Sequence, residues 1–203
     1  MADGAAFPLE RMARVAVFAS GRGSNLASLL RAFPPGGDEP LAAVRLVLSD
    51  RVSAAALERA REAGVPAVHV PFGRDRVTFE ARADALLREH AIDLVCLAGF
   101  MRVLSASFVG AWHGRIVNIH PSLLPAFRGL HAQRQALAAG ARESGCTVHF
   151  VDAGVDTGRP IVQRRVPVLE GDDEDALAAR ILEQEHVAYP EAVRLVLLGE
   201  VAP

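Results

Sequence analysis

The stretch RVAVFASGRGSNLASLLRAF, residues 14–33, joins an apolar run to an amphipathic run through a glycine-rich turn. The first half is typical of a buried strand, and the leucines of the second half recur at helical spacing. The same order follows along the chain, with VRLVLSD before SAAALERAREAG, PAVHV before RVTFEARADALLREH, and then the apolar run DLVCLAG. Continuous apolar strands that alternate with helices indicate a mostly parallel sheet covered by helices on both faces. We therefore predict an α/β fold, with a Rossmann-like order of strands and helices.

The pattern changes after Gly99. A short helix is expected at SASFVGAWHG, a strand at RIVNIH and a further helix near AQRQALAAG. The β-rich runs CTVHFVD and PIVQRRVPV predict a hairpin-like addition to the sheet. The last segment, residues 171–199, reads as a long helix with Asp172 as its N-cap, kinked or restarted near Pro190.

The composition suits one globular domain. The chain has 203 residues, 51% of them hydrophobic and 23% charged, and a formal net charge of −2. This balance gives no reason to expect a nucleic-acid partner. No run is long enough to span a membrane and the first residues lack a signal-peptide core, so we expect a cytoplasmic protein. Residues 1–14 are predicted to be a flexible extension and residues 15–203 the folded domain.

All 22 basic residues are arginine, because the chain contains no lysine. This excludes nucleotidases that need the lysine of a phosphate loop, and enzymes that need a lysine nucleophile. The two cysteines, Cys96 and Cys146, lie in apolar runs without the spacing of metal ligands, so we interpret them as core residues.

The turn FASGRGSNL, residues 18–26, lies where a strand is expected to end and a helix to begin. Glycines allow an anion to approach the backbone there, and free N–H groups at a helix start bind phosphate. A dinucleotide fingerprint would need a third glycine where Leu26 stands, although Asp50 imitates its ribose-binding acid. We favour phosphate binding over the alternative, a tight turn with Ser24 or Asn25 as helix cap.

The motif NIH, residues 118–120, ends an apolar strand. Side chains two positions apart share one face of a strand, so Asn118 and His120 point the same way. At the carboxyl end of a parallel strand, the two could together hold a small carbonyl group. The alternative for such a histidine is a hydrogen-bonded core residue, and for His149 in TVHFV we leave both interpretations open.

The acids Asp152 and Asp156 flank glycines between two β runs. Acids in such turns commonly cap their own backbone. The residues alone do not show that Asp156 meets His120.

Five segments, ASGRGSNL, AGFMRVLS, NIHPSLLPAFRGLHAQRQAL, TVHFVDAGVDTG and QEHVAYP, together resemble the phosphoribosylglycinamide formyltransferase family. The resemblance covers roughly Val15 to Leu195. It implies a single-domain formyltransferase fold and transfer of the formyl group of 10-formyltetrahydrofolate to the amine of glycinamide ribonucleotide, a step of purine synthesis. It also implies that no metal is needed and that the protein is a monomer or a weak homodimer.

The resemblance assigns roles to residues by position. The substrate would contact Gly23, Ser24 and Asn25 through its phosphate and Glu185 on its glycinamide side. The formyl donor would contact Arg76, Asn118 and the segment Met101, Arg102, Val103 and Leu104. The catalytic residues would be Asn118, His120 and Asp156, with Asn118 and protonated His120 donating to the oxyanion and Asp156 favouring the imidazolium by its charge. The sequence departs from the family pattern at DTGRPI, where Arg159 moves the proline back by one position.

Three alternatives remain open. A formyltetrahydrofolate hydrolase shares the catalytic core, but residues 1–14 are too few for the regulatory domain that such enzymes usually carry. A dinucleotide-binding oxidoreductase is disfavoured by Leu26. A ligand-binding module without catalysis would keep the phosphate turn and tolerate His120→Ala.

Overall fold

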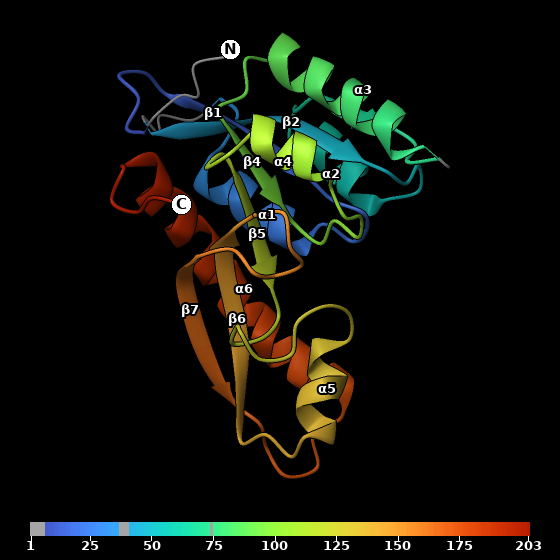
Figure 1. Ribbon diagram of the computed structural model, residues 1–203, viewed down its shortest axis with the longest axis vertical. Coiled ribbons are helices and arrows are strands. Elements are labelled where there is room, and N and C mark those ends of the chain that lie inside the picture. Colours follow the sequence, from blue (N-terminus) through green and yellow to red (C-terminus); the bar gives the residue numbers. More distant parts are fainter. Residues whose placement is uncertain (1–6, 37–40, 74) are drawn as a thin grey trace.

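The computed structural model describes residues 7–36, 41–73 and 75–203, and its elements follow the predicted alternation (Figure 1). The strands are β1 (Ala13–Phe18), β2 (Ala42–Ser49), β3 (Ala67–His69), β4 (Leu94–Leu97), β5 (Ile116–His120), β6 (Glu143–Phe150) and β7 (Pro160–Pro167). The helices are α1 (Ser24–Ala32), α2 (Ala55–Glu62), α3 (Arg76–Glu89), α4 (Ala106–Ala111), α5 (Ala132–Ala138) and α6 (Glu174–Leu197).

The strands form one seven-stranded sheet in the order β3-β2-β1-β4-β5-β6-β7. β1 to β5 pair in parallel, whereas β6 runs antiparallel to β5 and β7 antiparallel to β6. The predicted hairpin is thus confirmed as an addition to the edge of the parallel sheet. In the antiparallel pair of β5 and β6, Asn118 lies opposite His149 and His120 lies opposite Thr147.

Each face of the sheet has its own hydrophobic core. Alternate residues of β1 point to opposite faces, as Val15 and Val17 pack with α1, α2 and α6, whereas Ala16 and Phe18 pack with α3 and α4. In Figure 1, α6 lies along β6 and β7 while α3 and α4 lie together at the other end of the molecule. The predicted α/β fold with helices on both faces is therefore confirmed. Cys96 and Cys146 are buried and free, within the first of these cores.

The sequence predicted that the last helix is kinked or restarted near Pro190. It runs without a restart from Glu174 to Leu197, with Pro190 inside it. Tyr189 fixes this region, because its buried hydroxyl donates to the carbonyl oxygens of Leu97 and Val117. A proline removes one backbone hydrogen bond, and the surrounding packing compensates for that loss.

The N-cap of α6 is Asp173, which accepts from the N–H of Ala176, and the prediction of Asp172 was wrong. Asp172 instead accepts from the N–H of Leu169 and forms an ion pair with Arg180 at 2.7 Å. The hydrogen bond from Arg180 lowers the pKa of Asp172 to about 2. Either of two adjacent aspartates could cap the helix. Because Asp172 is held by Arg180, Asp173 is the residue that does so.

At the other end of the chain, β1 begins at Ala13, inside the segment that the sequence assigned to a flexible extension. Arg11 forms two hydrogen bonds with the carboxylate of Asp93, which also accepts from the N–H of Arg14. Ordered structure therefore starts before residue 15, and residues 1–6 lie outside the described part of the chain.

Candidate active site

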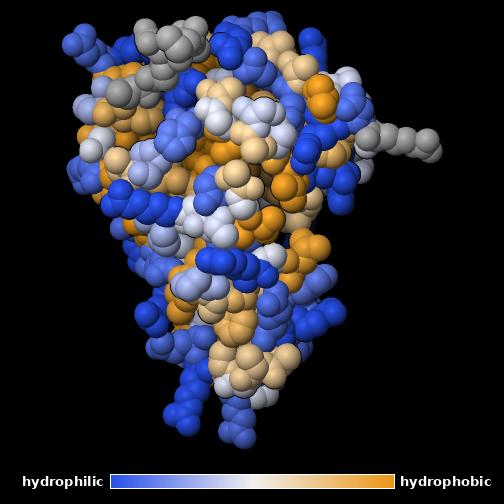
Figure 2. All heavy atoms as spheres, in the orientation of Figure 1, coloured by the Kyte–Doolittle hydropathy of each residue, from blue (hydrophilic) through white to orange (hydrophobic). Residues whose placement is uncertain are grey.

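A cavity of about 510 Å³ opens at the carboxyl ends of β4 and β5. Its rim carries Met101, Val103, Leu130 and Val155, each more than half exposed. Figure 2 shows apolar side chains gathered midway along the molecule, where the surface is hollowed. A concave, largely apolar site with a few convergent polar groups is typical of a small-molecule site.

Asn118 and His120 both line this cavity, as expected from their shared face of β5. His120 is buried, and its ring has an acceptor on each side. Nδ1 lies 3.3 Å from Oδ2 of Asp156, and Nε2 lies 2.9 Å from the carbonyl oxygen of Phe127. Two acceptors suit an imidazolium, since both of its nitrogens are donors.

Asp156 brings the other polar groups together. Its Oδ2 accepts from the N–H of Gly129 at 2.9 Å, and its Oδ1 lies 3.5 Å from Nδ2 of Asn118. Burial raises the pKa of Asp156, but the contacts with His149, Gly129 and His120 outweigh burial, so its pKa lies below the ordinary value. The carboxylate is thus ionised at neutral pH, beside the imidazole of His120.

His149 belongs to the same cluster, which the sequence did not predict. In the register of β5 and β6 it lies opposite Asn118, and its Nε2 is 3.2 Å from Asn118 Nδ2. Its Nδ1 lies 2.7 Å from the carbonyl oxygen of Phe150. If Nδ1 donates to that carbonyl, Nε2 is the acceptor for the Asn118 amide and fixes its orientation. The alternation of polar and apolar residues in TVHFV was the available signal.

Backbone strain concentrates at this site. Among the described residues other than glycine, four have positive φ, and three of these belong to the site: Phe127 (54°), His131 (59°) and Asp156 (52°). The strained position of Phe127 directs its carbonyl oxygen at His120. Such conformations persist only where the surrounding contacts impose them.

The loop from Pro121 to Leu130 is anchored to the hairpin. The N–H of Leu124 donates to Thr147 Oγ1 on β6, and the carbonyl oxygen of Leu124 accepts from Gln163 on β7. Ser122 closes the turn by donating to the carbonyl oxygen of Ala126. These contacts hold the loop in place beside the NIH motif.

The glycine turn has the backbone of an anion site. Gly23 is the N-cap of α1 with φ +75°, and no side chain caps the helix, so the alternative of Ser24 or Asn25 as cap was wrong. A side chain at Gly23 would lie only 2.9 Å from the Cα of Ala56. The first N–H groups of α1 therefore remain available to a phosphate.

Asn25 and Glu185, both predicted to bind the substrate, are in contact. Nδ2 of Asn25 donates to Oε2 of Glu185 at 2.7 Å, and both residues are buried. Oδ1 of Asn25 is also buried and has no hydrogen-bond partner in the described part of the chain. Burial raises the pKa of Glu185, although the hydrogen bond from Asn25 lowers it.

The predicted donor-binding residues divide into two groups. Met101, Arg102, Val103 and Leu104 line the cavity. Arg76 is not among the lining residues, and its Nε lies 3.9 Å from Oε1 of Glu80 on the same helix.

Two further residues turn away from the reacting groups. Asp50 pairs with Arg102 at 2.7 Å, which speaks against a ribose-binding role. Arg159 donates to the carbonyl oxygen of Ala202, so its side chain faces the C-terminal segment.

Within residues 7–36, 41–73 and 75–203, no group of three or more His, Cys, Asp or Glu side chains is arranged to hold a metal ion. No helix in these ranges is both long and apolar enough to cross a membrane.

An amide, an imidazole and a carboxylate thus meet in one cavity at the end of a parallel sheet, an arrangement that suits an enzyme acting on a small carbonyl group. A family model described as formyl transferase matches residues 13–193. The chain therefore belongs to the formyl transferase family.

Within this family, the chain is 45% identical over 179 residues to phosphoribosylglycinamide formyltransferase of Escherichia coli, covering 87% of this chain and 83% of that protein. It is 51% identical to the trifunctional purine biosynthetic protein adenosine-3 of Drosophila melanogaster over 94% of this chain, but spans only 14% of that relative's length. The solved structure of glycinamide ribonucleotide transformylase 1 from Symbiobacterium toebii has a TM-score of 0.89 and 48% identity, covering 98% of this chain and 94% of that one. The predicted resemblance to phosphoribosylglycinamide formyltransferases is thus confirmed.

Proposed function

We propose that this protein transfers the formyl group of 10-formyltetrahydrofolate to the amine of glycinamide ribonucleotide, giving N-formylglycinamide ribonucleotide and tetrahydrofolate in purine biosynthesis. The observation that carries the proposal is the convergence of Asn118, His120 and Asp156 on one wall of the cavity. The names of the relatives support this choice of substrates.

In the proposed reaction, the amine nitrogen forms a bond to the formyl carbon, and the carbonyl electrons move to oxygen. N–H groups of Asn118 and His120 donate to that oxyanion. One such donor contributes roughly 3 kcal/mol to the stability of the transition state. When the intermediate collapses, the bond from the formyl carbon to N10 of the folate breaks, and N10 gains the proton that the amine loses.

Asp156 holds the imidazolium of His120 in this scheme. Its depressed pKa keeps it ionised, so its Oδ2 can accept from an N–H at Nδ1 and orient the ring. The formyl oxygen then takes the place of the Phe127 carbonyl oxygen beside Nε2. A charged donor at this position is stronger than a neutral one.

The two substrates are proposed to enter from different sides. The ribonucleotide phosphate lies at the free N–H groups of α1, near Gly23, Ser24 and Asn25, while Glu185 contacts the rest of the substrate. The folate lies against Met101–Leu104 at the cavity rim. The amine and the formyl carbon would then meet beside Asn118 and His120. Arg76 can contribute only at the periphery of this site.

A turnover assay tests the proposal. Purified protein is mixed with 10-formyltetrahydrofolate, with and without glycinamide ribonucleotide, and tetrahydrofolate formation is followed. We expect deformylation only when both substrates are present. Deformylation that does not need the amine would indicate a hydrolase instead, and full activity of His120→Ala would refute the proposed role of the imidazole.

A further inference from the structure

Asp50 has no part in the reaction described above, yet its side chain is completely buried at the end of β2. Its Oδ2 accepts a hydrogen bond of 2.7 Å from Nε of Arg102. Its Oδ1 is also buried but has no hydrogen-bond partner among the described residues. A buried carboxylate that is only half satisfied opposes folding, so packing does not explain the residue.

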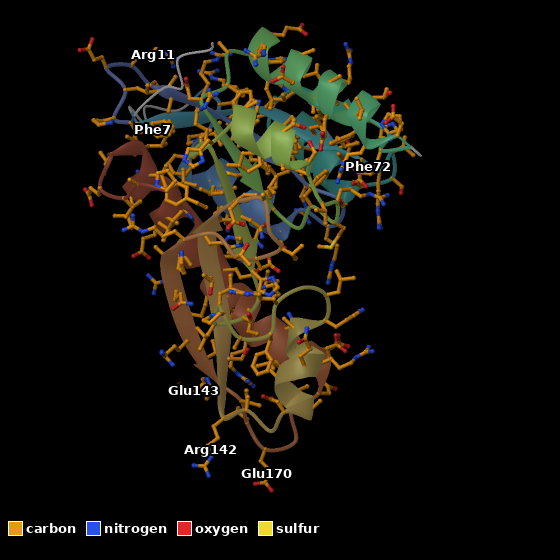
Figure 3. All side chains as sticks on the ribbon, in the orientation of Figure 1. Phe7, Arg11, Phe72, Arg142, Glu143 and Glu170 are labelled. Atoms are coloured by element: carbon orange, nitrogen blue, oxygen red, sulfur yellow. The ribbon has the colours of Figure 1, made fainter. Side chains whose placement is uncertain are left out.

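Arg102 is held on two sides. Asp50 binds its Nε, and the guanidinium carbon lies 4.9 Å from the centre of the Phe72 ring. Phe72 in turn packs against Phe79 of α3, with ring centroids 5.1 Å apart, and Figure 3 places it below α3 in the view. These contacts come from the segments that follow β2, β3 and β4. Arg102 lines the cavity and its side chain is 41% exposed, and its contact with Asp50 is made through Nε.

Arg102 also differs from the other cavity residues in its charge. Arg102 is the only arginine or lysine among the residues that line the cavity in the described structure. The cavity's carboxylates already have partners, with Asp152 bound by Thr157, Asp156 by His120 and Glu174 by Arg134. An anionic group that enters the cavity therefore meets a permanent positive charge at Arg102. Folates carry such a group, because their glutamyl end has two carboxylates.

We propose that Asp50 is a positioning residue for the formyl donor, which directs the Arg102 guanidinium so that its terminal N–H groups bind a carboxylate of the folate. This inference rests on the function proposed above. An arginine fork that is already oriented loses less freedom when it binds a carboxylate. Asp50 thus acts through Arg102 and touches neither substrate.

Steady-state kinetics of Asp50→Ala and Asp50→Asn test the inference. Removing the acceptor should raise the KM for 10-formyltetrahydrofolate about tenfold in Asp50→Ala, the effect of one lost orienting interaction. Asparagine keeps an acceptor, so the KM should rise less than about threefold. The kcat and the KM for the ribonucleotide should not change. A lower KM for the donor in either variant would mean that Asp50 only offsets the charge of Arg102, and would overturn the inference.

A second donor separates a direct role from a general structural one. With 10-formyltetrahydropteroate, which lacks the glutamyl group, Asp50→Ala should have the same KM as the wild type. An equal rise with both donors would overturn the inference. Asp172→Asn is the matched control, because it breaks a partly buried aspartate–arginine pair whose residues do not line the cavity, and it should change neither KM.

If Asp50→Ala does not fold, a double-variant cycle replaces it. In an Arg102→Met background, Asp50→Asn should have no further effect on the donor KM, whereas additive effects would overturn the inference. If the wild-type protein shows no turnover with both substrates present, the proposed function itself is refuted. The two failures are therefore distinguishable.

Discussion

Replacing Asp156 by asparagine removes one charge and little volume. The carboxylate lies 3.3 Å from Nδ1 of His120, a separation at which two unit charges attract by about 5 kcal/mol for an effective dielectric constant of about 20. Asparagine can still accept from the N–H of Gly129, and the surroundings relax in part. We therefore expect a loss of about 4 kcal/mol in the transition state, which corresponds to roughly a thousandfold lower kcat.

Single-turnover measurements of Asp156→Asn with both substrates at saturation would give this ratio. Ribonucleotide affinity, measured by calorimetry, should stay within about threefold of the wild type, because the phosphate turn is separate from the substituted residue. The pH profile of kcat should also change, since the imidazolium of His120 loses its partner. Asp172→Asn serves as the control for folding. A kcat within about tenfold of the wild type would refute the assignment of Asp156 to catalysis.

The other predictions concern the missed histidine and two carboxylates. His149→Ala should lower kcat about tenfold with little change in KM, because the Asn118 amide loses its acceptor, and His149→Gln should restore part of the rate; equal rates for all three proteins in steady-state kinetics would argue against this role. The pKa of Glu185 is raised by burial, so its contribution to stability is fully present below the ordinary pKa of 4.5 and is lost as the pH rises through the folded-state value. Glu185→Gln should therefore raise the Tm at pH 8 and not at pH 4, and should weaken ribonucleotide binding, which calorimetry checks. Asp172 has a depressed pKa of about 2, so its contribution is present above 3.8 and is lost as the pH falls toward 2. Asp172→Asn should lower the Tm at neutral pH, and thermal melts should show the difference shrinking below about pH 4.

The order and type of the elements could be predicted from the sequence because the apolar periods are strong. The buried run of β1 and the leucine spacing of α1 indicate a strand followed by a helix in residues 14–33. The N-terminus of α6 was harder to predict, because Asp172 and Asp173 are equally good N-cap residues. The ion pair of Asp172 with Arg180 leaves Asp173 as the N-cap. Likewise, Pro190 allows either a kinked or a restarted helix, and the sequence does not show that the buried Tyr189 anchors a continuous one.

The sequence pattern could predict only those site residues that lie on the same strand. The spacing of Asn118 and His120 places both on one face of β5, which the structure confirms. Asp156 lies 38 residues beyond Asn118, and its approach depends on where the hairpin loop closes, which no local pattern encodes. His149 was missed because its partner is set by the antiparallel register with Asn118. The alternation in TVHFV and the predicted hairpin-like addition to the sheet were signals for a polar residue on this strand, but neither gives the register.

The fate of the formyl carbon tests the central claim most directly. 10-Formyltetrahydrofolate carrying ¹³C in the formyl group is incubated with glycinamide ribonucleotide and the protein, and the products are separated by mass spectrometry. The account predicts that the label appears in N-formylglycinamide ribonucleotide with the wild type and is almost absent from it with His120→Ala. Label recovered as free formate, or equal labelling of the product by both proteins, would contradict it.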